Sequence, residues 1–279
     1  MTNALKQYLP ASMFQAVDLL PKNGQPMVLL TRHSIREPAD KQGFATYQLP
    51  LTQVGRNLAF EWGHWLSQNS DLQIAACLSS PIPRCVDTAS EMLKGAKLIN
   101  GIHNGTIQRI ENSPILSHTT QDSTAQSGII QNDMTQSLAL TIDQHGLLVE
   151  PGSFVLDIAQ AGPHFMQKGA LTFINQFLNH QLPGMKMPIE GAQDILRLLF
   201  NHLPKQNNQL LLAVSHDTIL AALFSVMAGQ SKIERQDWPD MMEGAFLWFD
   251  GDQFEHSVVN WIWRGQYYRF KPQLSQHST

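Results

Sequence analysis

The 279-residue chain contains few cysteines, few charged residues and no long apolar run. Its two cysteines, Cys77 and Cys85, are too few for a disulfide framework, and no zinc-ligand spacing involves both of them. Charged residues make up only 15% of the chain and the net charge is −4, which implies no broad basic face. A general nucleic-acid or membrane-surface binder is therefore not favoured, and any anion site must be locally concentrated.

No apolar segment approaches the roughly 18 residues that a membrane span needs. In residues 1–26, Leu5, Leu9, Met13 and Val17 recur at helical spacing, but polar residues interrupt them. This pattern predicts a short amphipathic helix and lacks the unbroken apolar region of a signal peptide. We therefore expect a cytoplasmic protein. The sequence leaves the oligomeric state open.

What the chain does have is apolar material, since 43% of its residues are hydrophobic. Short apolar runs at 27–30, 74–78 and 210–214 are typical of buried strands, and the last is nearly continuous, as in a parallel sheet buried on both faces. Each run is followed by helical spacing, for example at 219–227. Alternation of this kind predicts an α/β fold in which helices cover a mostly parallel sheet.

Two further patterns complete the predicted framework. Thr52 is a good N-cap for a helix that carries Val54, Leu58 and Trp62 on one face, which we expect to be buried. At the end of the chain, apolar runs within 246–270 are separated by turn residues and predict antiparallel hairpins.

The middle of the chain is harder to interpret. Residues 100–146 are rich in Asn, Ser, Thr, Gln and Gly, and a structureless run of that length is uncommon inside a compact domain. Helical spacing returns at 164–180 and at 189–203. We therefore expect a core formed by 1–94 and 189–279, with 95–188 as a cap insert.

Polar side chains follow each of the three predicted strands. They are Arg32, His33 and Arg36 after the first strand, Arg84 after the second, and His216 and Asp217 after the third. Taken singly, each has an ordinary explanation: Arg84 as a helix-surface arginine, His216 as a loop residue, Asp217 as an N-cap. In a parallel sheet, however, all three strand ends lie at one edge, where ligands bind in open α/β sheets. We expect these side chains to share one pocket.

The chemistry of this group suits phosphoryl transfer to a histidine. A neutral imidazole is a competent nucleophile, and arginine forks match phosphate oxygens while staying charged. An aspartic acid next to the second histidine can give the leaving alkoxide its proton and then activate the water that hydrolyses the phosphohistidine. This scheme needs neither a metal ion nor an organic cofactor.

The first of these segments resembles a signature of the histidine phosphatases. The acid phosphatase branch of that family has Arg-His-Gly-x-Arg-x-Pro, which Arg32, His33, Arg36 and Pro38 match. The sequence departs from the signature at Ser34, where the family usually has glycine. Because glycine permits close backbone approach, serine at this position either tightens the pocket or adds a hydroxyl to the phosphate cradle.

Other segments resemble the family in the same order along the chain. The Leu-Thr-x-x-Gly-Arg at 51–56 is similar to the helix that follows the first strand, and Ser-Ser-Pro at 79–81 with Arg84 is similar to the second motif. Residues 214–217 resemble the His-Asp motif that separates the acid phosphatase branch from the mutase-like branch. The matches cover 27–92 and 209–270.

The resemblance implies a role for every strand-end residue. His33 would be the phosphorylated nucleophile and Asp217 the general acid. The residues that would bind the phosphate are Arg32, Arg36, Arg84 and His216. The resemblance also implies a phosphoglycerate mutase-like fold, a three-layer α/β/α arrangement with a mixed, mostly parallel central sheet and a helical or irregular cap insert that selects the substrate.

We therefore expect a metal-independent histidine acid phosphatase that acts on a small phosphorylated substrate, with no nucleic-acid or membrane partner. The sequence leaves two alternatives. A phosphomutase of the same superfamily is one, although that branch usually takes its general acid from a glutamate in the middle of the chain. The other is a catalytically inactive module that binds phosphorylated ligands, if Ser34 spoils the approach to His33.

Overall fold

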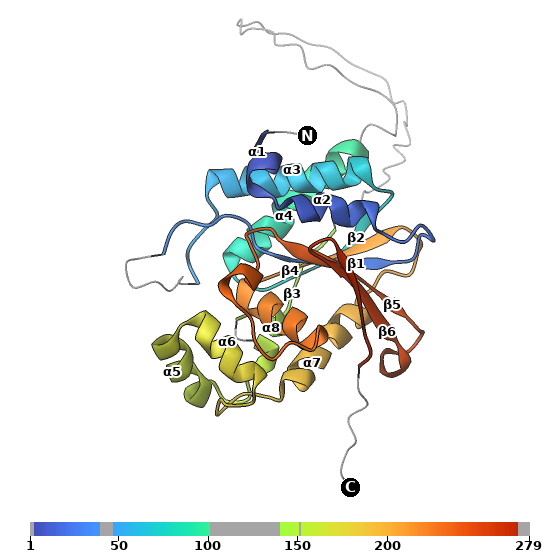
Figure 1. Ribbon diagram of the computed structural model, residues 1–279. Helices are drawn as coiled ribbons and strands as arrows, with labels where there is room; N and C mark the ends of the chain where they lie inside the picture. The colour runs from blue at the N-terminus through green and yellow to red at the C-terminus, as the bar shows by residue number, and fades with distance from the viewer. Residues whose placement is uncertain (1–2, 40–46, 101–139, 151, 273–279) are drawn as a thin grey trace, which may run out of the picture.

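The computed structural model describes residues 3–39, 47–100, 140–150 and 152–272. Within them, seven strands form one sheet that lies between two layers of helices (Figure 1). The three-layer α/β/α arrangement expected from the sequence is confirmed. Most of the polar segment at 100–146 lies outside the described residues.

Four strands run parallel and form one half of the sheet. They are β1 (Met27–Arg32), β2 (Gln73–Ser79), β3 (Asp143–Gln144) and β4 (Gln209–Ser215), in the order β3-β2-β4-β1. Every residue of β1 is buried, as expected of a strand covered on both faces. The three strands predicted from apolar runs are confirmed, whereas β3 is too short and too polar to be predicted.

The other half of the sheet is antiparallel. β5 (Gly244–Asp250) pairs with β1, and β6 (Val258–Trp263) and β7 (Gln266–Phe270) follow as hairpins. The 3-10 helix η4 (Phe254–His256) lies between β5 and β6. The turn between β6 and β7 contains Gly265 at φ 72°, a conformation that glycine adopts without steric cost. The predicted hairpins and the mixed character of the sheet are confirmed.

One face of the sheet is covered by the first four helices (Figure 1). These are α1 (Asn3–Tyr8), α2 (Ala11–Asp18), α3 (Gln53–Asn69) and α4 (Pro83–Asn100). Their apolar side chains, with Trp62 among the largest that are fully buried, form one hydrophobic cluster with that face of the sheet.

The start of α3 lies very close to the chain that leaves β1. The Thr52 side chain accepts a hydrogen bond from the Gly55 N–H at 2.9 Å, so the predicted N-cap is confirmed. A Cβ atom at Gly55 would lie only 2.0 Å from the Ile35 carbonyl oxygen, so this close approach requires glycine. Leu58 is buried as predicted. Val54, however, is 44% exposed, because the expected apolar face begins one turn later.

The remaining helices cover the opposite face. They are α5 (Ile158–Lys168), α6 (Ala170–Leu178), α7 (Pro188–Asn201) and α8 (Asp217–Met227), and α7 and α8 pack against each other (Figure 1). Their buried side chains form the second hydrophobic cluster. None of the helices in the described part of the chain is long and apolar enough to cross a lipid bilayer.

The helix predicted over 164–180 is in fact two helices. Gly169 separates α5 from α6 at φ 74°, outside the helical region, and so interrupts the backbone although the apolar spacing continues. The expected division of the chain into a core and a cap at 95–188 stays a prediction. The described part of that segment includes β3, which pairs with β2, and the 3-10 helices η1 (Gly146–Leu148) and η2 (Gly152–Phe154).

Candidate active site

The structure brings the strand-end residues together. Arg32 ends β1 and His33 follows it, Arg84 lies in the first turn of α4 after β2, and His216 and Asp217 follow β4. His33, Arg84 and His216 are 2%, 3% and 0% exposed. The parallel pairing of β1, β2 and β4 places their carboxyl ends at one edge of the sheet, which is why residues distant in sequence meet here.

The hydrogen bonds of His33 define its tautomer, with the proton on Nδ1 and the lone pair on Nε2. Its Nδ1 lies 2.8 Å from the Ser34 carbonyl oxygen, which can only accept, so Nδ1 carries the proton. Nε2 then holds the lone pair, and Arg84 Nε donates to it at 3.1 Å. Burial lowers the pKa of His33 well below its usual value, and the positive Arg32 nearby lowers it further. His33 is therefore a neutral imidazole.

His216 is the second buried imidazole. Its Nδ1 lies 3.4 Å from Arg84 Nη2, and its Nε2 lies 2.9 Å from Ser80 Oγ. Burial, with Arg84 as the next cause, lowers the pKa of His216 to about 3, so it is also neutral. Its ring stands edge-on to that of His33, with 5.6 Å between centroids. Arg84 thus connects the two imidazoles.

Arg32 and Asp217 form an ion pair, with 2.6 Å between Nη2 and Oδ2. Arg32 Nη1 also donates to the Pro239 carbonyl oxygen at 2.6 Å. The third nitrogen, Nε, is buried and has no acceptor among the described residues. A buried guanidinium donor without an acceptor is what an anion would satisfy.

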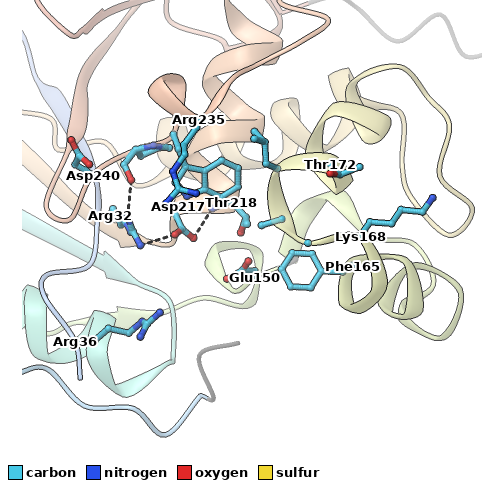
Figure 2. A pocket seen from close by; sticks show the side chains of 15 residues that line it. Arg32, Arg36, Glu150, Phe165, Lys168, Thr172, Asp217, Thr218, Arg235 and Asp240 are labelled. Atoms are coloured by element: carbon cyan, nitrogen blue, oxygen red, sulfur yellow. Dashed lines mark hydrogen bonds and ion pairs between the residues drawn. The ribbon is translucent and has the colours of Figure 1, made fainter. Parts of the chain in front are cut away.

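Arg36 lies farther out and is partly buried. Its Nη1 donates to the Glu37 carbonyl oxygen at 2.8 Å, and the guanidinium lines the same cavity as Arg32 (Figure 2). Burial lowers its pKa, and the neighbouring positive charges of Arg84 and Arg32 add to this. Three guanidinium groups therefore lie close enough to repel one another, and this repulsion favours an anion among them.

The cavity has a volume of about 690 Å³, within the range of small-molecule sites. Arg32, Arg36, Glu150 and Asp217 line the side next to the strand ends (Figure 2). The opposite wall is formed by two segments outside the sheet. They contribute Phe165, Lys168, Gly169, Ala170, Leu171 and Thr172 from α5 and α6, and Arg235, Trp238, Pro239 and Asp240 from the segment around the 3-10 helix η3 (Arg235–Asp237).

Glu150 is a cavity residue that our sequence reasoning missed. Burial raises its pKa to about 7, and the negative charge of Asp217 contributes to this shift. A carboxyl group with such a pKa is partly protonated near neutral pH and can donate a proton. The signal in the sequence was the apolar run at 147–149 that ends in a glutamate, the same pattern as at the ends of the longer strands.

Ser34 does not contribute to the cavity lining. Its hydroxyl donates to the Gly55 carbonyl oxygen at 2.7 Å, and its N–H donates to Thr88 Oγ1 at 2.9 Å. It is fully buried, and its φ is not positive, so the backbone at this position does not need glycine. The serine therefore anchors the turn after β1 to α3 and α4, instead of tightening the pocket or extending the phosphate cradle.

The two cysteines are free and buried. Burial raises the pKa of Cys77 and of Cys85 to about 12, so neither thiol is an activated nucleophile. Within the described ranges, no group of three or more His, Cys, Asp or Glu side chains is arranged to hold a metal ion.

No family model matches the sequence, and no curated protein matches it either. Solved structures do match. Mycobacterial hydrolase 1 and mycobacterial glucosyl-3-phosphoglycerate phosphatase each superpose with a TM-score of 0.50 at 13% identity, covering 86% of this chain and 99% of theirs. Mycobacterial hydrolase 2 has a TM-score of 0.49 at 14% identity, covering 90% of this chain and 93% of its own. At such identities, the likeness to the two structures with a TM-score of 0.50 shows the fold alone.

The fold matches the phosphoglycerate mutase-like α/β fold that the resemblance of the motifs implied. Its structural neighbours include phosphatases. The assignment to the acid phosphatase branch, the roles of the individual residues and the cytoplasmic location stay predictions.

Proposed function

We propose that this protein is a phosphatase that hydrolyses small phosphomonoesters through a covalent phosphohistidine on His33, without a metal ion. One observation carries the proposal: a buried, neutral imidazole presents its Nε2 lone pair to Arg84, next to a cavity lined by Arg32 and Arg36. A nucleophile among fixed positive charges is suited to stabilising a transferring phosphoryl group.

In the first step, His33 Nε2 attacks phosphorus, the bond to the ester oxygen breaks, and the leaving oxygen takes a proton from a carboxylic acid. In the second step, water attacks the phosphohistidine, the P–N bond breaks, and the proton released by water returns to the carboxylate. Arg84 donates to the attacking lone pair in the structure, so it must transfer that hydrogen bond to the phosphate. The negative charge of the substrate favours this transfer.

The general acid has two candidates. The sequence predicts Asp217, but one of its carboxylate oxygens is already engaged by Arg32 Nη2 at 2.6 Å. Glu150 lines the same cavity, and its pKa of about 7 favours the acid form. We assign Glu150 as the proton donor and Asp217 as the residue that orients Arg32. Two carboxyl groups in different environments of one site commonly take different roles in catalysis.

Glu150 also favours a second candidate function. A glutamate from the middle of the chain is the general acid that the mutase-like branch uses, so the His216-Asp217 pair no longer argues strongly against a phosphomutase. In that case the phosphohistidine would pass its phosphoryl group to a second substrate hydroxyl instead of to water.

The first experiment is phosphate release from an aryl phosphate in EDTA by the wild type and by His33→Ala. We expect turnover in the wild type and a loss of at least about a thousandfold in the variant, because the nucleophile is gone. His202→Ala is the matched control, since His202 follows α7 before β4 begins, at the other edge of the sheet.

A dependence on added metal would contradict the mechanism. A wild type that binds phosphate without turnover would favour the inactive binding module. Transfer to an added alcohol phosphate that far exceeds hydrolysis would favour the phosphomutase.

A further inference from the structure

A second buried charge lies directly behind Arg32. Glu243, 2% exposed, precedes β5, and its main-chain carbonyl oxygen accepts the Arg32 N–H at 2.9 Å. Its side-chain Oε2 accepts the Asp240 N–H at 2.8 Å. A buried carboxylate of this kind is costly without a cation.

The cation is Arg264, from the turn between β6 and β7. Its Nε and Nη2 lie 2.9 and 3.0 Å from the two carboxylate oxygens of Glu243, a bidentate fork. The remaining donor capacity goes to main-chain carbonyls: Nη1 binds the Gln236 oxygen at 2.6 Å and Nη2 the Trp238 oxygen at 3.0 Å. Arg264 also stacks on the Trp263 ring, 5.0 Å from its centroid.

The main chain that Arg264 holds is one wall of the cavity. Trp238, Pro239 and Asp240 line the cavity, and apart from the single turn of η3 this segment belongs to no helix or strand. Its geometry therefore depends on contacts from outside. The Pro239 carbonyl oxygen, in turn, fixes Arg32 Nη1. The contacts therefore connect Arg264, through adjacent residues of this segment, to the Arg32 guanidinium that lines the cavity.

We propose that Arg264 and Glu243 are a positioning pair, which orients Arg32 for phosphate by holding the segment 236–240. The inference rests on the proposed function in one respect only, that Arg32 binds the phosphoryl group. Neither Arg264 nor Glu243 lines the cavity, so both act through other residues. An arginine side chain has many rotamers, and a fixed carbonyl acceptor removes most of them before the ligand arrives.

The test separates positioning from stability. Arg264→Met leaves the buried Glu243 carboxylate without its cation, and Glu243→Met leaves the partly exposed Arg264 without its carboxylate. The double variant replaces both with apolar side chains of similar length. For all three we would measure the dissociation constant of inorganic phosphate by calorimetry, kcat and KM on an aryl phosphate, and the thermal midpoint. Arg197→Met is the matched control, because Arg197 pairs with Glu255 and stacks on Phe254 at the exposed surface.

We expect all three variants to bind phosphate about tenfold more weakly and to show a raised KM, as small misplacements of a binding group do. The double variant should recover much of the thermal midpoint without recovering phosphate affinity. Arg197→Met should leave phosphate affinity unchanged. If either single variant does not fold, the phosphate affinity and thermal midpoint of the double variant are sufficient to test the proposal.

Phosphate affinity that returns with the thermal midpoint in the double variant would overturn the inference, because the pair would then be merely structural. Wild-type affinity in Arg264→Met would overturn it as well. A wild type that binds no phosphate at all would instead refute the proposed function and, with it, the role given to Arg32.

Discussion

The two sides of the cavity are built differently. Next to one side, His33, Arg84 and His216 are buried at the ends of parallel strands, outside the cavity lining itself, and each has hydrogen-bond partners. On the other side, Lys168 and Arg235 are exposed residues on short elements outside the sheet. The first side has the rigidity that chemistry needs, and the second can change without disturbing the sheet.

From this contrast we infer that the two sides of the cavity have different functions. The strand-end side would carry out the phosphoryl transfer, and the outer wall would choose the organic part of the substrate. Phe165 and Trp238 offer rings on that wall, while Lys168 and Arg235 offer positive charge. Four further predictions test whether the two sides are separable.

The largest effect after loss of the nucleophile is expected for Arg84→Met. Arg84 contacts both imidazoles, so its loss removes a charge from the transition state and also frees His216. We expect kcat on an aryl phosphate to fall about 10²- to 10³-fold. Arg56→Met is the control, since Arg56 pairs with Asp87 at 2.6 Å between α3 and α4. A loss below tenfold would mean that the strand-end side is less essential than its burial indicates.

The next effect concerns the proton donor. The donor must be protonated, and Glu150 has a pKa of about 7, so turnover of an alkyl phosphate should fall as the pH rises through about 7. Glu150→Gln should cost about 10²-fold on alkyl esters and abolish this pH dependence, with a smaller loss on aryl esters, whose leaving group scarcely needs a proton.

Asp217→Asn is the comparison for that experiment. We expect it to raise KM, because Arg32 loses its partner, while the fall in turnover above neutral pH persists. If the pH dependence disappears in Asp217→Asn and persists in Glu150→Gln, the sequence-based assignment of Asp217 as general acid is right and ours is wrong.

A smaller effect is expected on the outer wall. Lys168→Met and Arg235→Met should raise KM by up to about tenfold for substrates that carry a second anionic group, because exposed charges contribute modestly. Substrates without that group should be affected less, and kcat should hardly change. A large fall in kcat in either variant would show that the two sides are not separable.

The smallest effect is expected for Ser34→Gly. The change removes the hydroxyl bond to Gly55, which should lower the free energy of unfolding by about 1 kcal/mol in a denaturant titration. Activity should stay within about threefold, because the hydroxyl donates to the Gly55 carbonyl oxygen and is not free to bind phosphate. A large gain in turnover would instead mean that serine obstructs the approach to His33.

Local patterns in the sequence were sufficient for the framework. Apolar runs at β1, β2 and β4, the Thr52 cap and the terminal hairpins follow from short-range rules, and the structure confirms them. Short-range rules failed at Val54 and at Gly169. At Val54, packing decides which turn of the helix is covered. At Gly169, the backbone conformation of a single residue ends the helix, although the apolar spacing continues.

By itself, the sequence determined that Arg32, His33, Arg84 and His216 would meet, because parallel strands carry the residues that follow them to one edge. Only the tertiary structure decided what each does there. It paired Arg32 with Asp217, placed Glu150 in the cavity, and joined Arg264 to Glu243 behind the wall. Protonation and side-chain orientation depend on burial and on charges brought from distant parts of the chain, and neither can be predicted from spacing along the sequence.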